Sequence, residues 1–361
     1  YVVHRKDLTY VIGEMIGELN CGHSYVGGGE MTKVDPVNIG LLGIDFELDR
    51  SSGFYRITKI YPGRNWDENT RSPLTEPGIK IEEGDYIVAI DGKTMTSEYH
   101  PYKACVDKVQ DYVTLEVNDE PQKQGAKEYT VKTIKSENGI RYLDWVETNR
   151  KKVDSMTNGK VGYVHIPNMM TEGLNEFVKY FYPQIRKEGL IVDVRFNGGG
   201  FVSQMIIERL NRILTMVGNA RNSKHVSTYP DAVFTGPMVC MLNQFSASDG
   251  DIFPYNFKQN NLGKLVGKRS WGGVIGIRGS LPLLDGSYLY KPEFSHFSTD
   301  GEWILEGVGM SPDIEVDNDP AKEYQGTDQQ LNKAVEVILE EIETYDGPTI
   351  PEVPEYPDRS K

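Results

Sequence analysis

The sequence has no long apolar run and few cysteines. None of its apolar stretches approaches the roughly 20 residues that a membrane-spanning helix needs, so we expect no span. Its three cysteines, Cys21, Cys105 and Cys240, are odd in number, far apart and without metal-site spacing. They predict free thiols rather than a disulfide framework or a zinc site. The six histidines are scattered too, and we expect neither a metal nor a cofactor.

Positive charge is also scarce. The chain has 39 Lys and Arg against 53 Asp and Glu, a formal net charge of −14. This balance argues against nucleic acid and anionic membranes as partners, because both attract basic surfaces. The 361 residues exceed what one core normally organises, and 37 Gly with 19 Pro indicate a globular protein rich in turns. The chain begins at Tyr1 without a signal-like segment, so we expect a fragment of a longer protein.

What is present is, first, a stretch at 243–251 with the pattern of a catalytic turn. An apolar run leads into small residues around Ser248, and an amphipathic segment follows. This order predicts a buried strand, a tight turn and a helix start. Unpaired N–H groups at a helix N-terminus favour developing negative charge, as an attacked carbonyl requires. Ser and Asp are also favoured helix caps, so plain capping is the alternative for Ser248.

The chain around this stretch alternates strands and helices, which predicts an α/β sheet with βαβ crossovers. The strand at 190–194 leads into Gly198, Gly199 and Gly200, which allow close backbone approach to a ligand. No dinucleotide or Walker motif is present, which disfavours a nucleotide-binding enzyme. His165 lies within a strand and is interpreted as a core residue. The other expected elements are helices at 174–188, 203–216 and 331–342, a strand at 238–242 and a hairpin around 285–286.

The first half of the chain has a different pattern of apolar and turn residues. Apolar residues at helical spacing continue to Leu19, and a small-residue turn with His23 follows. A histidine after a helix end usually interacts with the helix dipole, so catalysis is the less common role. Residues 143–153 are interpreted as a short connecting segment. Between these segments we expect strands at 42–46, 55–60, 86–90, 113–117 and 129–134.

A Gly-bracketed apolar loop at 40–44 and an Asp-Gly hairpin turn after the strand at 86–90 together resemble a PDZ domain. The resemblance implies that the backbone amides of Leu41, Leu42 and Gly43 receive a peptide C-terminus beside an exposed strand edge. The alternative is a spacer barrel without a ligand.

The motifs together resemble the C-terminal half of the tricorn proteases and their bacterial homologues, in the C-terminal processing group of serine peptidases (S41 type). The likeness covers nearly the whole chain, and the order of its motifs makes it specific. Besides the PDZ-like stretch, it rests on Gly22-His23-Ser24-Tyr25, Trp145-Val146-Glu147, Gly162-Tyr163-Val164-His165-Ile166-Pro167, Phe196-Asn197-Gly198-Gly199-Gly200, Ser246-Ala247-Ser248-Asp249-Gly250-Asp251, Trp271-Gly272-Gly273-Val274-Ile275-Gly276 and Glu306-Gly307-Val308-Gly309.

The resemblance implies a serine endopeptidase or C-terminal processing protease that hydrolyses peptides or unfolded proteins through an acyl-enzyme. Ser248 would be the nucleophile, His23 the general base, and Glu306 the group that orients the imidazole. The backbone amides of Gly198 and Asp249 would form the oxyanion hole. A glutamate in a Gly-rich turn is otherwise commonly solvated, so this role for Glu306 depends on the resemblance.

One residue departs from the family pattern. Gly22 stands where tricorn has a serine that bridges the base and the glutamate, so Ser24 or a water would supply the bridge. The family's preference for basic residues comes from an acidic residue between the triple glycine and the nucleophile, for which Asp231 is a loose candidate. The alternative function, which Gly22 favours, is a catalytically silent relative that binds peptides or hydrophobic ligands.

The resemblance also implies partners and a compartment. We expect β-propeller domains ahead of this fragment and assembly into a homo-oligomer, and we favour a periplasmic location with the cytoplasm as the alternative. The expected fold is a multidomain α+β and α/β protein. Its parts are an N-terminal helical segment carrying the catalytic histidine (1–36), a PDZ-like β-barrel domain (37–137), a crotonase-like α/β peptidase domain (138–346) and a Pro-rich tail (347–361).

Overall fold

A computed structural model describes residues 2–223, 225–358 and 360. Its contacts group the chain into two compact units. One unit is Lys33–Thr148, and the other combines the preceding segment, Tyr1–Thr32, with Asn149–Lys361. The segment that carries His23 therefore belongs to the same unit as Ser248. The division into four parts expected above remains a prediction.

The unit that contains Ser248 is built on a five-stranded parallel sheet with strand order β16-β13-β12-β9-β8. Its central strands are buried at every position, because helices cover both faces. This burial explains why they are nearly unbroken apolar runs in the sequence. The strands are β8 (Val161–His165), β9 (Gly189–Asp193), β12 (Met238–Leu242), β13 (Gly263–Gly267) and β16 (Ile314–Glu315).

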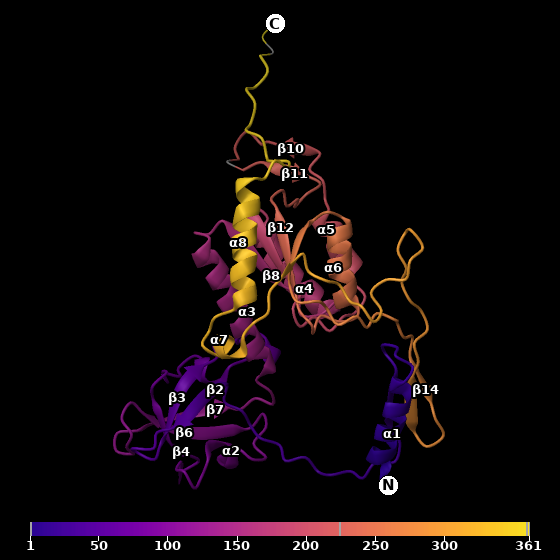
Figure 1. Ribbon diagram of the computed structural model, residues 1–361. Helices are drawn as coiled ribbons and strands as arrows, with labels where there is room; N and C mark the ends of the chain where they lie inside the picture. Colours follow the sequence, from indigo (N-terminus) through magenta and orange to yellow (C-terminus); the bar gives the residue numbers. More distant parts are fainter. Residues whose placement is uncertain (1, 224, 359, 361) are drawn as a thin grey trace. The chain divides into compact units, whose positions relative to one another are not determined.

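Helices flank this sheet on two sides, as crossover connections require. Figure 1 shows α8 on one face of the strands and α5 with α6 on the other. The helices of this part of the chain are α3 (Asn138–Met156), α4 (Thr171–Phe181), α5 (Ser203–Leu210), α6 (Asp249–Gln259), α7 (Pro320–Tyr324) and α8 (Gln329–Glu343), with a 3-10 turn at Tyr182–Gln184.

Three of the expected segments differ from the structure by more than two residues. The helix expected at 174–188 ends at Phe181, because Pro183 has no N–H for a continuing α-helix. The helix expected at 203–216 ends at Leu210, before the short strand β10 (Met216–Gly218). The connecting segment expected at 143–153 lies inside the helix α3. Its buried residues recur at helical spacing, a signal that was present in the sequence: Ile140, Leu143, Val146 and Val153.

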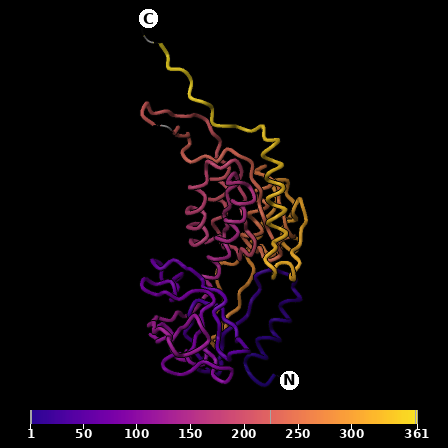
Figure 2. Tube along the Cα trace, turned by 90° about the vertical axis from the view of Figure 1, so that its left-hand side faces the viewer, coloured from indigo at the N-terminus to yellow at the C-terminus, as the bar shows by residue number. Residues whose placement is uncertain are grey.

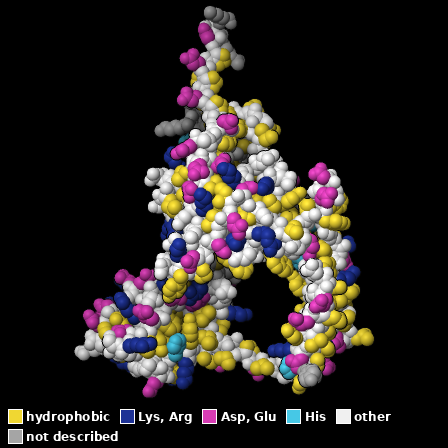
Figure 3. All heavy atoms as spheres, in the orientation of Figure 1, with side chains coloured by type: hydrophobic (Ala, Val, Ile, Leu, Met, Phe, Trp, Pro, Cys, Tyr) yellow, Lys and Arg dark blue, Asp and Glu magenta, His cyan; other side chains and the backbone are white. Residues whose placement is uncertain are grey.

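Two small antiparallel sheets complete this unit. One joins β1 (Tyr25–Gly28), β15 (Ser287–Tyr290) and β14 (Ser280–Pro282), with helix α1 (Arg5–Gly17) beside β1. Hydrophobic side chains are exposed along the β14–β15 hairpin (Figure 3). The other sheet pairs β10 with β11 (Ser227–Tyr229). Figure 2 shows the C-terminal tail leaving α8 near these two strands, and residues of the tail and of β10 together line a cavity of about 490 Å³.

The Lys33–Thr148 unit is a six-stranded antiparallel sheet with order β2-β3-β4-β6-β7 and with β5 paired to β4. Asp91 and Gly92 form the turn between β4 and β5 with positive φ, as the Asp-Gly pair predicts. The elements are β2 (Ile44–Leu48), β3 (Tyr55–Ile60), β4 (Tyr86–Ile90), β5 (Lys93–Thr94), α2 (Pro101–Ala104), β6 (Tyr112–Asn118) and β7 (Lys127–Lys132), with 3-10 turns at Glu68–Thr70 and Pro73–Thr75.

Candidate active site

The parallel sheet brings the glycine loop and the serine turn side by side. β9 and β12 are neighbouring parallel strands, so the loops after their carboxyl ends emerge at the same edge. Two hydrogen bonds join these loops: the amide of Ala247 donates to the carbonyl of Asn197 at 2.8 Å, and the hydroxyl of Ser246 donates to the carbonyl of Val194 at 2.8 Å. The position of Ser248 relative to the glycines is therefore set by hydrogen bonds to the backbone carbonyls that precede them.

Ser248 occupies the N-cap position of α6 in a strained conformation. Its φ is 58° and its ψ is −121°, a combination that non-glycine residues rarely adopt. Its side chain makes no capping hydrogen bond. Asp328, at the N-cap of α8, does accept a hydrogen bond from the amide of Leu331. The geometry thus does not support plain capping for Ser248, and a serine on a strained strand-to-helix turn is typical of an exposed nucleophile.

The glycine loop touches this turn closely. At Gly199, where φ is +91°, an added Cβ would lie 2.6 Å from the Ser248 Cβ and 3.0 Å from the Asp249 amide nitrogen, so a side chain is excluded. The Gly199 amide itself donates to the side chain of Asn197 at 2.9 Å. The amides of Gly198 and Asp249 donate no hydrogen bond to any of the described residues. Two unpaired N–H groups therefore flank the serine, which is what an oxyanion requires.

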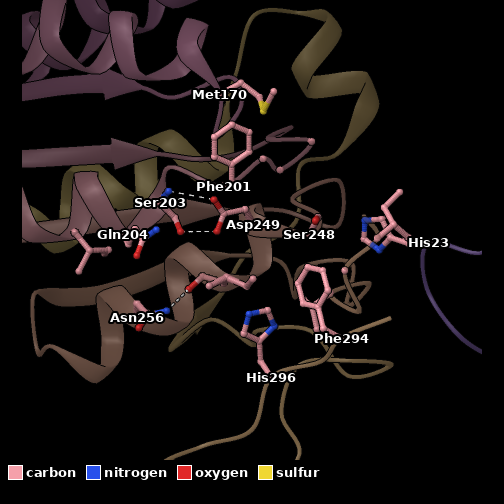
Figure 4. Close-up of a pocket in the computed structure, with 18 of the residues that line it drawn as sticks. His23, Met170, Phe201, Ser203, Gln204, Ser248, Asp249, Asn256, Phe294 and His296 are labelled. Carbon is pink, nitrogen blue, oxygen red and sulfur yellow. Dashed lines mark hydrogen bonds between the residues drawn. The ribbon is translucent and has the colours of Figure 1, made fainter. Parts of the chain in front are cut away.

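His23 and Ser248 line one cavity of about 910 Å³ (Figure 4). His23 lies in the turn after α1 with a φ of 59°, and its ring meets those of Tyr25 and Trp271 edge-on at centroid distances of 6.0 and 6.4 Å. Its Nδ1 is buried and has no hydrogen-bond partner in the part of the chain that the structure describes. Within the described part of the chain, no hydrogen bond joins His23 to Ser248.

The protonation state of His23 suits a base. Burial lowers the pKa of its imidazole below the ordinary 6.5, and the charge of Glu306 raises it by less. The ring is therefore neutral near pH 7 and can accept a proton.

Glu306 is held by three backbone amides. Its Oε1 accepts from Gly22 at 2.6 Å, and its Oε2 accepts from Val274 at 2.7 Å and from Ile275 at 2.9 Å. Burial would raise the pKa of this carboxyl, but these hydrogen bonds and the nearby His23 outweigh burial and lower it. Glu306 is thus a fixed negative charge. It affects His23 electrostatically and through the amide of the preceding residue, without the direct hydrogen bond that an orienting partner would make.

The expected bridge through Ser24 is not present. The hydroxyl of Ser24 is buried and has no hydrogen-bond partner among the described residues, so it connects neither His23 nor Glu306. The connection to the glutamate is made by the amide of Gly22 instead. A Cβ at Gly22 would lie 3.0 Å from Oε1 of Glu306 and 3.0 Å from the Cα of Gly273. The glycine therefore fits a space that is tight on two sides.

We expect Gly22→Ser to lower kcat/KM by about 10- to 100-fold, because the added Cβ must displace either Glu306 or the Gly273 backbone and with them the turn that carries His23. Peptide hydrolysis by the two chains measures this. Gly17→Ala, at the end of α1 where a Cβ meets nothing within 4 Å, is the matched control and should keep full activity. Equal or higher activity of Gly22→Ser would contradict the expectation.

Several residues of the cavity were not identified from the sequence. Asp231 is not among the lining residues, because it lies by β11 with its carbonyl bound to Arg212. The carboxylates that do line the cavity are Glu208 and Asp249, and the latter accepts hydrogen bonds from the amide and hydroxyl of Ser203. The sequence feature that could have indicated Glu208 is its position in the helix that directly follows the triple glycine. The other lining residues missed are Gln204, Asn256, Phe294 and His296.

The PDZ-like loop differs from its expected role in the other unit. The amide of Leu41 donates to the carbonyl of Ile134 at 2.9 Å, and the amide of Gly43 donates to Oε1 of Glu137 at 2.9 Å. These two amides are not free to receive a peptide C-terminus, so only Leu42 of the three expected residues keeps an unpaired N–H among the described residues. The expectation of an open loop was wrong because distant acceptors reach it.

The described residues contain neither a metal-binding cluster nor a helix that could cross a membrane. No group of three or more His, Cys, Asp and Glu side chains is placed to hold a metal ion there. None of the helices there has both the length and the apolar character that crossing a membrane demands.

Comparisons with known proteins identify the family of the chain. Residues 160–316 match peptidase family S41, and residues 40–136 match the tricorn protease PDZ domain. A tricorn protease homolog of Saccharolobus solfataricus is 41% identical, covering 94% of this chain and 31% of the relative. The tricorn protease of Thermoplasma acidophilum is 39% identical, with 94% and 31% covered. The crystal structure of the tricorn protease matches with a TM-score of 0.88 at 38% identity, covering 95% of this chain and 33% of that one.

These matches confirm the family resemblance seen in the motifs and the fold expected from it. The chain spans about a third of the length of these relatives. Ser248 and Glu306 both lie within the range that matches the peptidase family. With its tricorn-type PDZ domain and its peptidase region, the chain belongs to peptidase family S41.

Proposed function

We propose that this chain hydrolyses peptide bonds in peptides or unfolded proteins through an acyl-enzyme on Ser248. The observation that carries the proposal is the geometry of Ser248: its backbone is strained, its side chain makes no capping hydrogen bond, and it lies beside the amides of Gly198 and Asp249, which donate to none of the described residues. Covalent labelling of Ser248 by a fluorophosphonate tests it. The cavity beside this serine is large enough for several side chains of an extended substrate.

The reaction would proceed in two halves. His23 takes the proton of the Ser248 hydroxyl as the oxygen attacks the scissile carbonyl, and the resulting oxyanion accepts hydrogen bonds from Gly198 and Asp249. Collapse of this intermediate breaks the C–N bond, and the imidazolium gives its proton to the leaving amine. Water, deprotonated by His23, then attacks the ester, and the proton returns to Ser248 as the acid product leaves.

Glu306 would stabilise the imidazolium that forms in both halves. Its carboxylate is negative and fixed by three amides, so no reorganisation is needed when His23 becomes charged. Glu208 is exposed in the same cavity and is our candidate for attracting a basic side chain of the substrate, in place of Asp231.

The pH dependence follows from His23. We expect kcat/KM to rise with pH with an acid-limb midpoint below 6.5, since burial lowers the pKa of His23 and only its neutral form accepts the proton. Glu306→Gln should move the midpoint lower still, because the carboxylate raises that pKa. Initial rates at low substrate concentration across pH 4 to 9 report the midpoint. An acid limb centred above 6.5 in the native chain would contradict this assignment.

We propose further that the chain works as part of a longer protein. Its relatives are about three times as long, which is compatible with upstream β-propeller domains and with a homo-oligomer. These relatives include archaeal proteins, so they lend no support to the periplasmic location expected from the sequence.

A further inference from the structure

The PDZ-like loop holds a carboxylate that belongs to the chain itself. Glu137, the residue before helix α3, is buried with 7% of its surface exposed. Its Oε1 accepts the amide hydrogen of Gly43 at 2.9 Å. Gly43 has a φ of +75°, and the space around it is lined by Ile140 and Pro73. A glutamate side chain therefore occupies the loop that resembles a receptor for a peptide's terminal carboxylate.

A guanidinium completes the environment of this carboxylate. Arg141 donates to Oε2 of Glu137 from Nε at 2.9 Å and from Nη2 at 2.6 Å, a two-pronged contact that planar guanidinium and carboxylate groups favour. Arg141 also donates to Asp45 at 2.7 Å and to the hydroxyl of Tyr61 at 2.6 Å, and it stacks on the Tyr61 ring. Loss of Glu137 would thus leave Arg141 with a counter-charge and in place.

The strand that follows the loop has the position that pairing with an extended peptide requires. β2 lies at the edge of the six-stranded sheet, and among the described strands only β3 pairs with it, so its outer edge can add an extended peptide. Phe46, on β2, contacts the rings of His100 and Tyr102 next to α2. The amide of Leu42 makes no hydrogen bond to any described residue. A sheet edge can pair with the backbone of an extended peptide, and backbone amides can bind its terminal carboxylate. A guanidinium such as that of Arg141 can bind the same carboxylate.

We propose that Glu137 is an internal occupant of this loop, and that a peptide with a free C-terminal carboxylate binds there when the Glu137 side chain is withdrawn. The arriving carboxylate takes the Gly43 and Leu42 amides and the Arg141 guanidinium. The carboxylate of Glu137 and that of the peptide compete for the same donors, so the chain with Glu137 in place is closed to C-termini.

The test uses full-length chains that also carry Ser248→Ala, so that no probe is cleaved. Two fluorescent hexapeptides ending in valine, one with a free carboxylate and one amidated, are titrated by fluorescence anisotropy. Glu137→Ala should bind the free-carboxylate peptide at least tenfold more tightly than the chain with Glu137 intact, and should not gain affinity for the amide. Adding Arg141→Met to Glu137→Ala should abolish the gain. Glu128→Ala, an exposed glutamate on β7, makes the same charge change and should gain nothing.

Each outcome of this experiment either supports or overturns the proposal. No gain in a folded Glu137→Ala chain, checked by circular dichroism and thermal unfolding, overturns the proposal, as does equal binding by the chain with Glu137 intact. A gain for both peptides also overturns it, because the carboxylate is then not recognised. If Glu137→Ala does not fold, Glu137→Gln replaces it: its amide oxygen still fits Gly43 but cannot pair ionically with Arg141, so a smaller carboxylate-dependent gain is expected.

Discussion

Replacing Ser248 by alanine is expected to abolish labelling of the chain by a fluorophosphonate and to lower peptide hydrolysis by at least about 10⁴-fold. The serine hydroxyl is the attacking group, and among the described non-glycine residues with positive φ Ser248 is the one that carries a hydroxyl. Gel fluorescence after labelling, and turnover of a peptide substrate, measure the two effects. His23→Ala should also lose labelling, because an unactivated serine reacts poorly with the probe.

Ser24→Ala is the control for this experiment. The Ser24 hydroxyl is buried next to His23 in the sequence but has no hydrogen-bond partner, so its removal should leave labelling unchanged. Labelling that survives in Ser248→Ala would place the reactive serine elsewhere. A folded native chain that is never labelled would contradict an activated Ser248 in this chain.

Replacing Arg195 by leucine is expected to lower the free energy of unfolding by about 3–5 kcal/mol. Arg195 is 1% exposed and lies between two carboxylates. Its Nε and Nη2 donate to Asp193 at 2.8 to 3.1 Å, and its Nη1 donates to Asp328 at 2.8 and 3.0 Å. Leucine would leave both negative charges buried without their cation, and this penalty exceeds the favourable burial of a leucine.

Urea unfolding, followed by a probe in the parallel-sheet unit, measures this effect. Arg278→Leu is the matched control: Arg278 pairs with Glu293 at 2.8 Å, but its side chain is 74% exposed, and such surface pairs contribute about 0–1 kcal/mol. Similar losses in the two variants would contradict the argument. A loss confined to Arg195→Leu would also explain how the strand end before the glycine loop is kept rigid.

Much of the fold could be predicted from local patterns. The apolar runs at 190–194 and 238–242 are the central strands to within one residue, because strands buried on both faces require continuous apolar side chains. The Ser248 turn was also identified locally, since small residues between a buried strand and an amphipathic segment allow few structures. The length of α3 was missed because its apolar positions were not counted as a helical face.

The candidate site was only partly predictable. Ser248 and the glycines follow neighbouring parallel strands, and parallel order places their loops at one edge. The contact between the Gly22 amide and Glu306 could not be predicted, because the two residues are 284 positions apart and no local pattern reports such a pair. The same applies to Glu208: the sequence contains the residue, but only the position of α5 places it on the wall of the cavity.

The sequence by itself determined the local elements: where strands and helices run, where the backbone needs glycine, and which serine lies at a helix start. These depend on side-chain periodicity and on φ and ψ, which neighbouring residues control. Only the tertiary structure decided which acceptor each donor meets. The amide of Gly22 goes to Glu306, and the amide of Gly43 goes to Glu137 rather than to a peptide. Hydrogen bonds have strict distance and angle requirements, so their partners are chosen by how distant segments pack.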